Sequence, residues 1–324
     1  MIVRWGLDAL EPLLRELRLE RPLLISSARW AGLELPVAER FHGVKPHAEI
    51  DSVGEATERA HHADALVALG GGSAIDTAKA VGAATGLPVV AVPTTYSGAE
   101  WTDYFGMRDP QRGVKRGGSG KRPVAIVYEP KLTLDLPRGA SGGTALNALA
   151  HCAEALYVAG RNAEGDEHAL AGARRIAQSL PQVLANGHEL EARTTLLRGA
   201  MHAGAALGEA GLGLGHAMAQ ALGGRYGIPH GAANALCLPP ALRFNGPAVP
   251  EAIARFGQAI GADDPAARAE ELARLAGFER LRDLGVPEDG LEEVAQATAA
   301  RAGARANPRP ATAEQIAELL RTIW

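Results

Sequence analysis

The sequence contains very little cysteine: Cys152 and Cys237 are the only two thiols, and both stand in apolar neighbourhoods. Two such residues do not supply a disulfide framework or a thiolate metal site, and they favour a reducing compartment. No apolar run approaches the roughly 18 residues of a membrane span, and the first residues lack a signal-peptide pattern. We therefore expect a cytoplasmic protein that does not associate with membranes.

The sequence also lacks an excess of positive charge. Its formal net charge is -4 and its isoelectric point is near 6.2, so it offers no basic surface to neutralise nucleic-acid phosphates. Nucleic acid is therefore excluded as the expected partner. In contrast, 47% of its 324 residues are hydrophobic, which is enough to form a large core and, by length, two domains.

The hydrophobic pattern changes about two-fifths of the way along the chain. Short apolar runs bounded by Gly, Pro or Ser predict buried strands at residues 22–26, 65–69, 88–92 and 124–127. Helical spacing between these runs, at residues 7–17 and 73–84, predicts a Rossmann-like α/β domain with a parallel sheet over residues 1–138. From residue 139 to 324 the pattern is helical throughout, with breaks near residues 186, 228 and 286 and a last helix over 312–323. We expect this second domain to be all α.

A glycine-rich turn follows the second of these strands and begins a helix. Its residues Gly70, Gly71, Gly72 and Ser73, with Asp76 one turn later, place unhindered backbone amides at a helix N-terminus, where a pyrophosphate binds well. The turn lacks the G-x-G-x-x-G spacing of the usual dinucleotide site, and such turns also occur as simple tight turns. Both interpretations stay open from the residues alone.

Hydroxyl side chains follow the next strand. Thr94, Thr95, Ser97 and Thr102 stand where ligands bind in parallel α/β sheets, and they are candidates for contacts with ribose and nicotinamide. A loop that caps the next helix would have a similar composition. Lys115 is a candidate cation for the same ligand, with a solvated surface lysine as the alternative.

Three imidazoles and an amide form the third candidate group. Asn147 and His151 are four residues apart and share one face of a helix, while His216 and His230 flank a glycine-rich helix and turn. Neutral imidazoles are common ligands of divalent first-row metals, although a single histidine is more often only a satisfied polar residue.

These motifs, in this order and spacing, resemble the iron-containing alcohol dehydrogenase superfamily. The resemblance rests on the glycine turn, on the Pro-Thr-Thr-Tyr-Ser-Gly loop that begins at Pro93, on the Asn-Ala-Leu-Ala-His-Cys segment that begins at Asn147, and on the surroundings of His216 and His230. Within the superfamily the chain is most similar to maleylacetate reductases. The resemblance implies a dehydroquinate synthase-like architecture, a cofactor NAD or NADP, and a small-molecule carbonyl or alcohol as the substrate. A homodimer is common among such relatives.

The resemblance also implies a metal site at which this chain departs from the pattern. Metal-dependent members hold Fe2+ or Zn2+ with an Asp and three His, and these positions are here Asn147, His151, His216 and His230. An amide oxygen is a neutral, weaker ligand than a carboxylate, so we expect weaker metal binding. Maleylacetate reductases likewise have Asn at this position.

Further departures concern the cofactor and a fourth histidine. Gln220 stands where a further histidine is usual, and Ala99 stands where the loop usually has Ser. Ser27 lies near the position where NAD-preferring members have an acidic residue for the ribose, and with Arg29 close by the sequence is compatible with NADPH.

Hydride transfer to a carbonyl requires a group that stabilises and protonates the developing oxyanion. A metal does this in the metal-dependent relatives; without one, a protonated histidine among the three, assisted by the Asn147 amide, is the candidate. The cluster would suit an anionic substrate such as a keto diacid, and the candidate carboxylate clamps are Arg108, Arg112, Arg225 and Arg243. The sequence leaves three hypotheses: a metal-independent carbonyl reductase, a metal-dependent alcohol dehydrogenase, and a non-redox lyase or nucleotide-binding pseudo-enzyme.

Overall fold

The structure is a computed structural model that describes residues 1–111 and 114–324, with backbone only for residues 114–116. Its contacts divide the chain into two units. The first comprises Met1–Thr95 and Ala99–Thr133, and the second comprises Tyr96–Gly98 and Leu134–Trp324. The sequence predicted a single division after residue 138, whereas the contacts change after Thr133 and assign the short segment Tyr96–Gly98 to the second unit.

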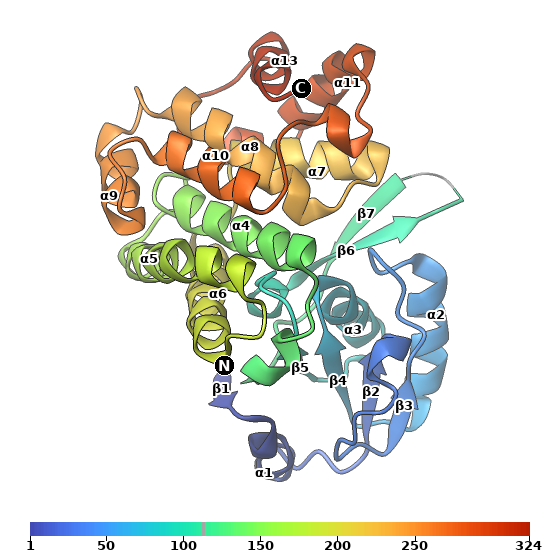
Figure 1. Cartoon of the computed structure of the whole chain (residues 1–324). Helices are drawn as coiled ribbons and strands as arrows, with labels where there is room; N and C mark the ends of the chain where they lie inside the picture. Colours follow the sequence, from blue (N-terminus) through green and yellow to red (C-terminus); the bar gives the residue numbers. More distant parts are fainter. Residues whose placement is uncertain (112–113) are drawn as a thin grey trace. The chain divides into compact units, whose positions relative to one another are not determined.

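A six-stranded sheet in which all neighbouring strands are parallel forms the first unit, in the order β1-β8-β5-β4-β2-β3 (Figure 1). The strands are β1 (Ile2–Trp5), β2 (Pro22–Ser26), β3 (Glu39–Phe41), β4 (Ala65–Gly70), β5 (Val89–Pro93) and β8 (Ala125–Tyr128). The four expected strands are β2, β4, β5 and β8, and all their residues are buried. The predicted parallel α/β fold is confirmed.

Helices cover both faces of this sheet. Neighbouring strand residues alternate between two cores: Val67 and Leu69 pack with α1 (Leu10–Glu16), whereas Leu66 and Ala68 pack with α2 (Ile50–Arg59) and α3 (Gly72–Thr85). This burial on both faces explains why the strands read as continuous apolar runs. Short 3-10 helices complete the unit: Leu7–Ala9, Ala28–Trp30, Ala60–His62, Ala99–Trp101 and Pro130–Thr133.

An antiparallel hairpin, β6 (Tyr104–Asp109) with β7 (Val114–Ser119), was not expected from the sequence. Lys79 of α3, only 1% exposed, holds its start. The Lys79 ammonium donates to the carbonyls of Ala99 and Tyr104 at 2.8 and 2.6 Å and to the Thr102 hydroxyl at 3.1 Å. Asp76 pairs with Lys79 at 3.1 Å and accepts the Gly106 N–H, so a partly buried ion pair joins the hairpin to α3.

The second unit is helical throughout the part that the structure describes, as predicted. Its α-helices are α4 (Arg138–Ala155), α5 (Ala163–Ala185), α6 (Leu190–Ala210), α7 (Leu214–Tyr226), α8 (His230–Asn245), α9 (Pro250–Ile260), α10 (Pro265–Leu275), α11 (Leu291–Ala299), α12 (Ala302–Ala306) and α13 (Ala313–Thr322). Two 3-10 turns lie at Arg282–Leu284 and Glu288–Gly290. Helix α4 contacts α5, α6 and α8, and is buried along almost its whole length (Figure 1).

The helices contain the two cysteines of the chain. Cys152 of α4 and Cys237 of α8 are both free and completely buried, and burial raises the pKa of each thiol well above its usual range. Among the described residues, no helix combines the length and the apolar character that crossing a membrane requires.

Candidate functional site

The glycine turn and the threonine loop lie side by side at the carboxyl ends of two neighbouring strands of the first unit's sheet. Strands β4 and β5 are neighbours, Gly70 is in register with Pro93, and the Thr94 N–H donates to the Gly70 carbonyl at 3.0 Å. An added Cβ at Gly71 would lie 2.7 Å from the Thr95 methyl group, so only glycine fits there without a shift. The structure thus brings together two of the predicted cofactor segments.

The N-terminus of α3, which follows β4, presents backbone amides to which an anion can bind. Gly71 is the N-cap of α3 and has no side-chain capping hydrogen bond; the Ala74 N–H donates to the Gly71 carbonyl, and the amides of Gly72 and Ser73 before it are the candidates for a ligand. Ser73, in that turn, accepts the His47 N–H at 2.9 Å. Ser27 follows β2, the other neighbour of β4, and therefore stands at the same carboxyl edge.

The other predicted cofactor residues have different surroundings. Asp76 and Thr102 are both engaged by the buried ammonium of Lys79. Ser97 belongs to the second unit, where its carbonyl accepts a hydrogen bond from Asn147. The side chain of Lys115 lies outside the described residues, and so does Arg112.

The three imidazoles come together in the second unit. Asn147 and His151 lie on α4, His216 lies on α7, and His230 is the first residue of α8. The rings of His151 and His216 stack with their centroids 4.6 Å apart, and the centroid of His230 lies 5.9 Å from that of His216. Asn147 and His151 are 4% and 3% exposed and His216 is fully buried, whereas His230 is only partly buried.

A chain of hydrogen bonds fixes the orientation of Asn147. The Ser97 carbonyl can only accept, so the Asn147 Nδ2 faces it at 3.1 Å and the Asn147 oxygen faces Asn234, which donates to it at 2.7 Å. The same Asn234 Nδ2 lies 3.0 Å from the Nε2 of His230. This His230 nitrogen therefore accepts a hydrogen bond and carries no proton in the neutral ring.

Glu154 is a second residue, besides Asn234, that the sequence analysis missed. Its carboxylate is fully buried and accepts the Nδ1–H of His216 at 2.7 Å, together with the backbone N–H groups of Gly213 at 2.6 Å and His216 at 3.1 Å. A spacing signal was present: Glu154 follows Asn147 and His151 on one face of α4, at positions i, i+4 and i+7, and Asn234 follows His230 by four residues.

The histidines differ in how well they tolerate charge. Burial, reinforced by the neighbouring His216 and His230, holds the pKa of His151 well below its usual value, so its ring is neutral near pH 7. His230 opens α8, and the positive end of a helix dipole opposes a charge there. The Nδ1 of His216 lies 2.7 Å from the buried Glu154 carboxylate, and its Nε2 has no hydrogen-bond partner among the described residues. His216 is therefore the best placed proton donor of the three.

The donor arrangement does not fit a resident metal ion. Within residues 1–111 and 114–324, no group of three or more His, Cys, Asp or Glu side chains is placed to hold one. The His151 and His216 rings are stacked at 18° to each other, and the Asn147 oxygen already accepts from Asn234. That hydrogen bond takes one of the two lone pairs of a neutral oxygen, which is a weaker ligand than a carboxylate.

A buried arginine holds the segment that packs against the imidazole cluster. Arg193 of α6 is 1% exposed and donates to the Tyr96 hydroxyl at 3.1 Å and to the Ser141 hydroxyl at 2.7 Å. Tyr96 precedes Ser97, so the contact fixes the segment whose carbonyl orients Asn147. An added Cβ at Gly98 would lie 3.4 Å from the Nδ1 of His151, which shows how closely this segment packs against the imidazoles.

Two of the arginines considered as carboxylate clamps form ion pairs with glutamates of the chain. Arg225 forms an ion pair with Glu293, and Arg243 forms one with Glu270 at 2.5 Å. Arg108 lies on β6, in the first unit, where its backbone N–H donates to the His47 carbonyl.

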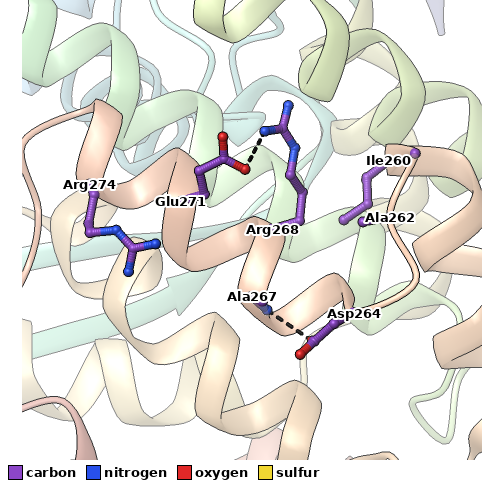
Figure 2. A pocket seen from close by; sticks show the side chains of 8 residues that line it. Ile260, Ala262, Asp264, Ala267, Arg268, Glu271 and Arg274 are labelled. Atoms are coloured by element: carbon purple, nitrogen blue, oxygen red, sulfur yellow. Dashed lines mark hydrogen bonds and ion pairs between the residues drawn. The ribbon is translucent and has the colours of Figure 1, made fainter.

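A surface hollow of about 490 Å3 lies beside α10, and Figure 2 shows the side chains that line it. Its polar groups are largely paired with one another: Asp264 caps α10 through the Ala266 and Ala267 amides, and Arg268 pairs with Glu271. The imidazoles are not among its lining residues, so we do not assign the chemistry to it.

Comparison with known proteins identifies the family. Residues 7–130 match the iron-containing alcohol dehydrogenase family model, and residues 142–324 match the model of the C-terminal part of the Fe-containing alcohol dehydrogenase family. The chain belongs to the iron-containing alcohol dehydrogenase family. It is thus an NAD(P)-dependent oxidoreductase of the carbonyl-reducing kind, as the resemblance implied.

Several relatives within this family are maleylacetate reductases. The one from Pseudomonas knackmussii is 36% identical over 338 residues, which cover 99% of this chain and 95% of that protein. The one from Sphingobium indicum is 40% identical over 278 residues, which cover 85% of this chain and 78% of that protein. The crystal structure of maleylacetate reductase from Agrobacterium tumefaciens superposes with a TM-score of 0.90 at 32% identity, covering 100% of this chain and 95% of that one. The expected branch of the family is confirmed.

Proposed function

We propose that this enzyme uses NADH or NADPH to reduce the carbonyl group of a keto diacid of the maleylacetate type, and that His216 donates the proton. The observation that supports this assignment most strongly is the buried Glu154–His216 pair, whose outer nitrogen, Nε2, has no partner among the described residues. The maleylacetate reductase relatives support the substrate class.

The step balances without a metal ion. Bound NADH or NADPH would supply the hydride for the carbonyl carbon, and the carbonyl oxygen, which gains the C=O π electrons, would take the Nε2 proton of His216. The products are the hydroxy acid and the oxidised cofactor, and solvent returns a proton to His216. Neutral His151 stacks on His216 and covers one face of the donor ring.

In this proposal the first unit would bind the cofactor, and the second would bind the substrate and protonate it. Gly70, Gly71, Gly72 and Ser73 would bind the pyrophosphate, with Thr94 and Thr95 close by for the rest of the dinucleotide. Asn147, His151 and His230 would position the carbonyl group and His216 would protonate it. A cytoplasmic location and a homodimer remain parts of this proposal.

The test is the absorbance of NADH and NADPH during turnover of keto diacids and simple aldehydes, with and without a strong chelator. Chelator-resistant oxidation of the cofactor by a keto diacid is the expected result. His216→Gln should lower kcat by about 10²- to 10⁴-fold while cofactor binding, followed by nicotinamide fluorescence, is retained. Chelator-sensitive turnover of simple aldehydes would instead favour a metal-dependent alcohol dehydrogenase, and full activity of His216→Gln would remove His216 from the mechanism.

A further inference from the structure

Arg301 has an unusual environment for an arginine. It precedes α12 and is half-buried, and its Nε is buried without a hydrogen-bond partner among the described residues. Its two terminal nitrogens donate only to Gln220, to the side-chain oxygen and to the backbone carbonyl, at a long 3.4 Å each. Burial lowers the pKa of Arg301, and within the part of the chain that the structure describes no carboxylate opposes this effect.

Two other arginines of the same unit, the buried Arg193 and the partly buried Arg255, have more hydrogen-bond or ion-pair partners. Arg193 donates to hydroxyl and carbonyl oxygens on several sides, and Arg255 forms a 2.6 Å ion pair with Asp166. Removing a guanidinium from water without a counter-ion is costly, and proteins normally avoid it. The described part of the chain supplies no counter-ion for Arg301, so its charge is available to a ligand.

Arg301 also contacts the helix that carries the proton donor, one to two turns beyond His216. Gln220, its partner, follows His216 by four residues on α7, which is about one helical turn or 6 Å along the axis. An added Cβ at Gly224 would lie 3.8 Å from the Arg301 Nη2, so the guanidinium lies along the next turn of the same helix. An added Cβ at Gly303 would lie 2.6 Å from the Gly213 carbonyl, so tight packing fixes the start of α12 against the start of α7.

We propose that Arg301 binds a carboxylate of the substrate and thereby selects keto acids over uncharged aldehydes and ketones. This inference rests on the proposed function. A guanidinium matches a carboxylate with two parallel N–H···O bonds, and a carbonyl a few bonds away from that carboxylate could reach the Nε2 of His216. Gln220, at the position where the family pattern has a further histidine, provides Arg301 with a neutral oxygen partner and leaves its charge for the ligand.

The experiment compares kcat/KM for a keto acid with that for its uncharged methyl ester in wild type, Arg301→Gln, Arg301→Lys and Arg305→Gln. Arg305 is an exposed arginine of α12 that donates to the Ala300 carbonyl, so it is a matched control. Arg301→Gln should lower kcat/KM for the acid by about 10- to 100-fold, since hydrogen bonds to charged groups are worth about that factor, with little effect on the ester. Arg301→Lys should be intermediate and Arg305→Gln should match wild type. An equal loss for acid and ester, or no loss for the acid, would overturn the proposal.

A binding measurement separates this inference from the proposed function. Malonate, a dicarboxylate that cannot be reduced, should raise the Tm of wild type and of Arg305→Gln but not that of Arg301→Gln. If wild type reduces no carbonyl compound, the proposed function fails, and the malonate result still decides for or against an anion site at Arg301. An equal rise in Tm for wild type and Arg301→Gln would refute that site even if the enzyme reduces keto acids.

Discussion

Asn147→Asp tests the hydrogen-bond chain through the cluster. The substitution replaces the Nδ2 that donates to the Ser97 carbonyl at 3.1 Å with an oxygen, so two acceptors face each other in a site where Asn147 is 4% exposed. The hydrogen bond from Asn234 is kept and becomes charge-assisted. The structure is therefore adapted to an amide at this position, although a carboxylate has nearly the same shape.

The expected change in the free energy of unfolding follows from these two effects. An unsatisfied buried carbonyl and an uncompensated buried charge together cost about 3–5 kcal/mol, and the stronger bond from Asn234 returns about 1 kcal/mol. The expected net loss of stability at pH 7 is about 2–4 kcal/mol, which for a chain of 324 residues corresponds to a fall in Tm of roughly 3–6 °C. Burial raises the pKa of the new carboxyl, so the folded state binds its proton more tightly than the unfolded state, and the loss should shrink towards pH 4.

The assay is thermal unfolding in chelator and then in Zn2+. Because the substitution completes the Asp and three His pattern implied by the resemblance, Zn2+ should restore at least part of the lost stability in Asn147→Asp and have little effect on wild type. Asn245→Asp is the matched control: Asn245 is a fully buried amide on α8 that pairs with Asn307, and zinc should not rescue it. If Asn147→Asp is as stable as wild type in chelator at pH 7, the orientation assigned to the Asn147 amide is wrong.

Three further predictions concern other parts of the molecule. Glu154→Gln should reduce kcat by about 10²- to 10⁴-fold, because the amide disturbs the tautomer and charge of His216; stopped-flow kinetics with an unchanged rate would contradict this role. Burial lowers the pKa of His202 to about 4, below its unfolded value, so its contribution to stability is present above about pH 6.5 and is lost as the pH falls towards 4. In urea titrations His202→Gln should therefore lose less stability than wild type between pH 7 and 4, and parallel curves would exclude this contribution. Gly71→Ala should weaken NADH binding, measured by fluorescence, because its Cβ would lie 2.7 Å from the Thr95 methyl group; Thr95→Ser in the same chain should restore part of the affinity, and no restoration would mean that this contact is not the cause.

Much of the fold could be predicted because the central strands are buried on both faces. The runs at β2, β4, β5 and β8 are apolar without interruption, and the sequence pattern shows this directly. The outer strands β1 and β3 are short and only partly buried, so their sequences do not form such runs. The β6–β7 hairpin is rich in glycine and charge, and it depends on buried Lys79, whose role depends on contacts distant in sequence.

The candidate site was only partly predictable for the same reason. Motif spacing found the imidazoles and Asn147, but Glu154 and Asn234 look like ordinary helix residues until α4, α7 and α8 are packed together. The pairing that gives His216 its charge partner joins residues 62 positions apart in the sequence. Spacing along one helix could have drawn attention to Glu154; it could not have shown which histidine it contacts.

The rate at which the two buried thiols react with a reagent reports on the stability of the helical unit. Cys152 and Cys237 are completely buried, and their raised pKa values keep them as unreactive thiols in the folded protein. A maleimide or disulfide reagent can therefore modify them only when α4 or α8 opens. The rate of labelling, followed by mass spectrometry without any introduced probe, thus measures how often the scaffold of the imidazole cluster comes apart.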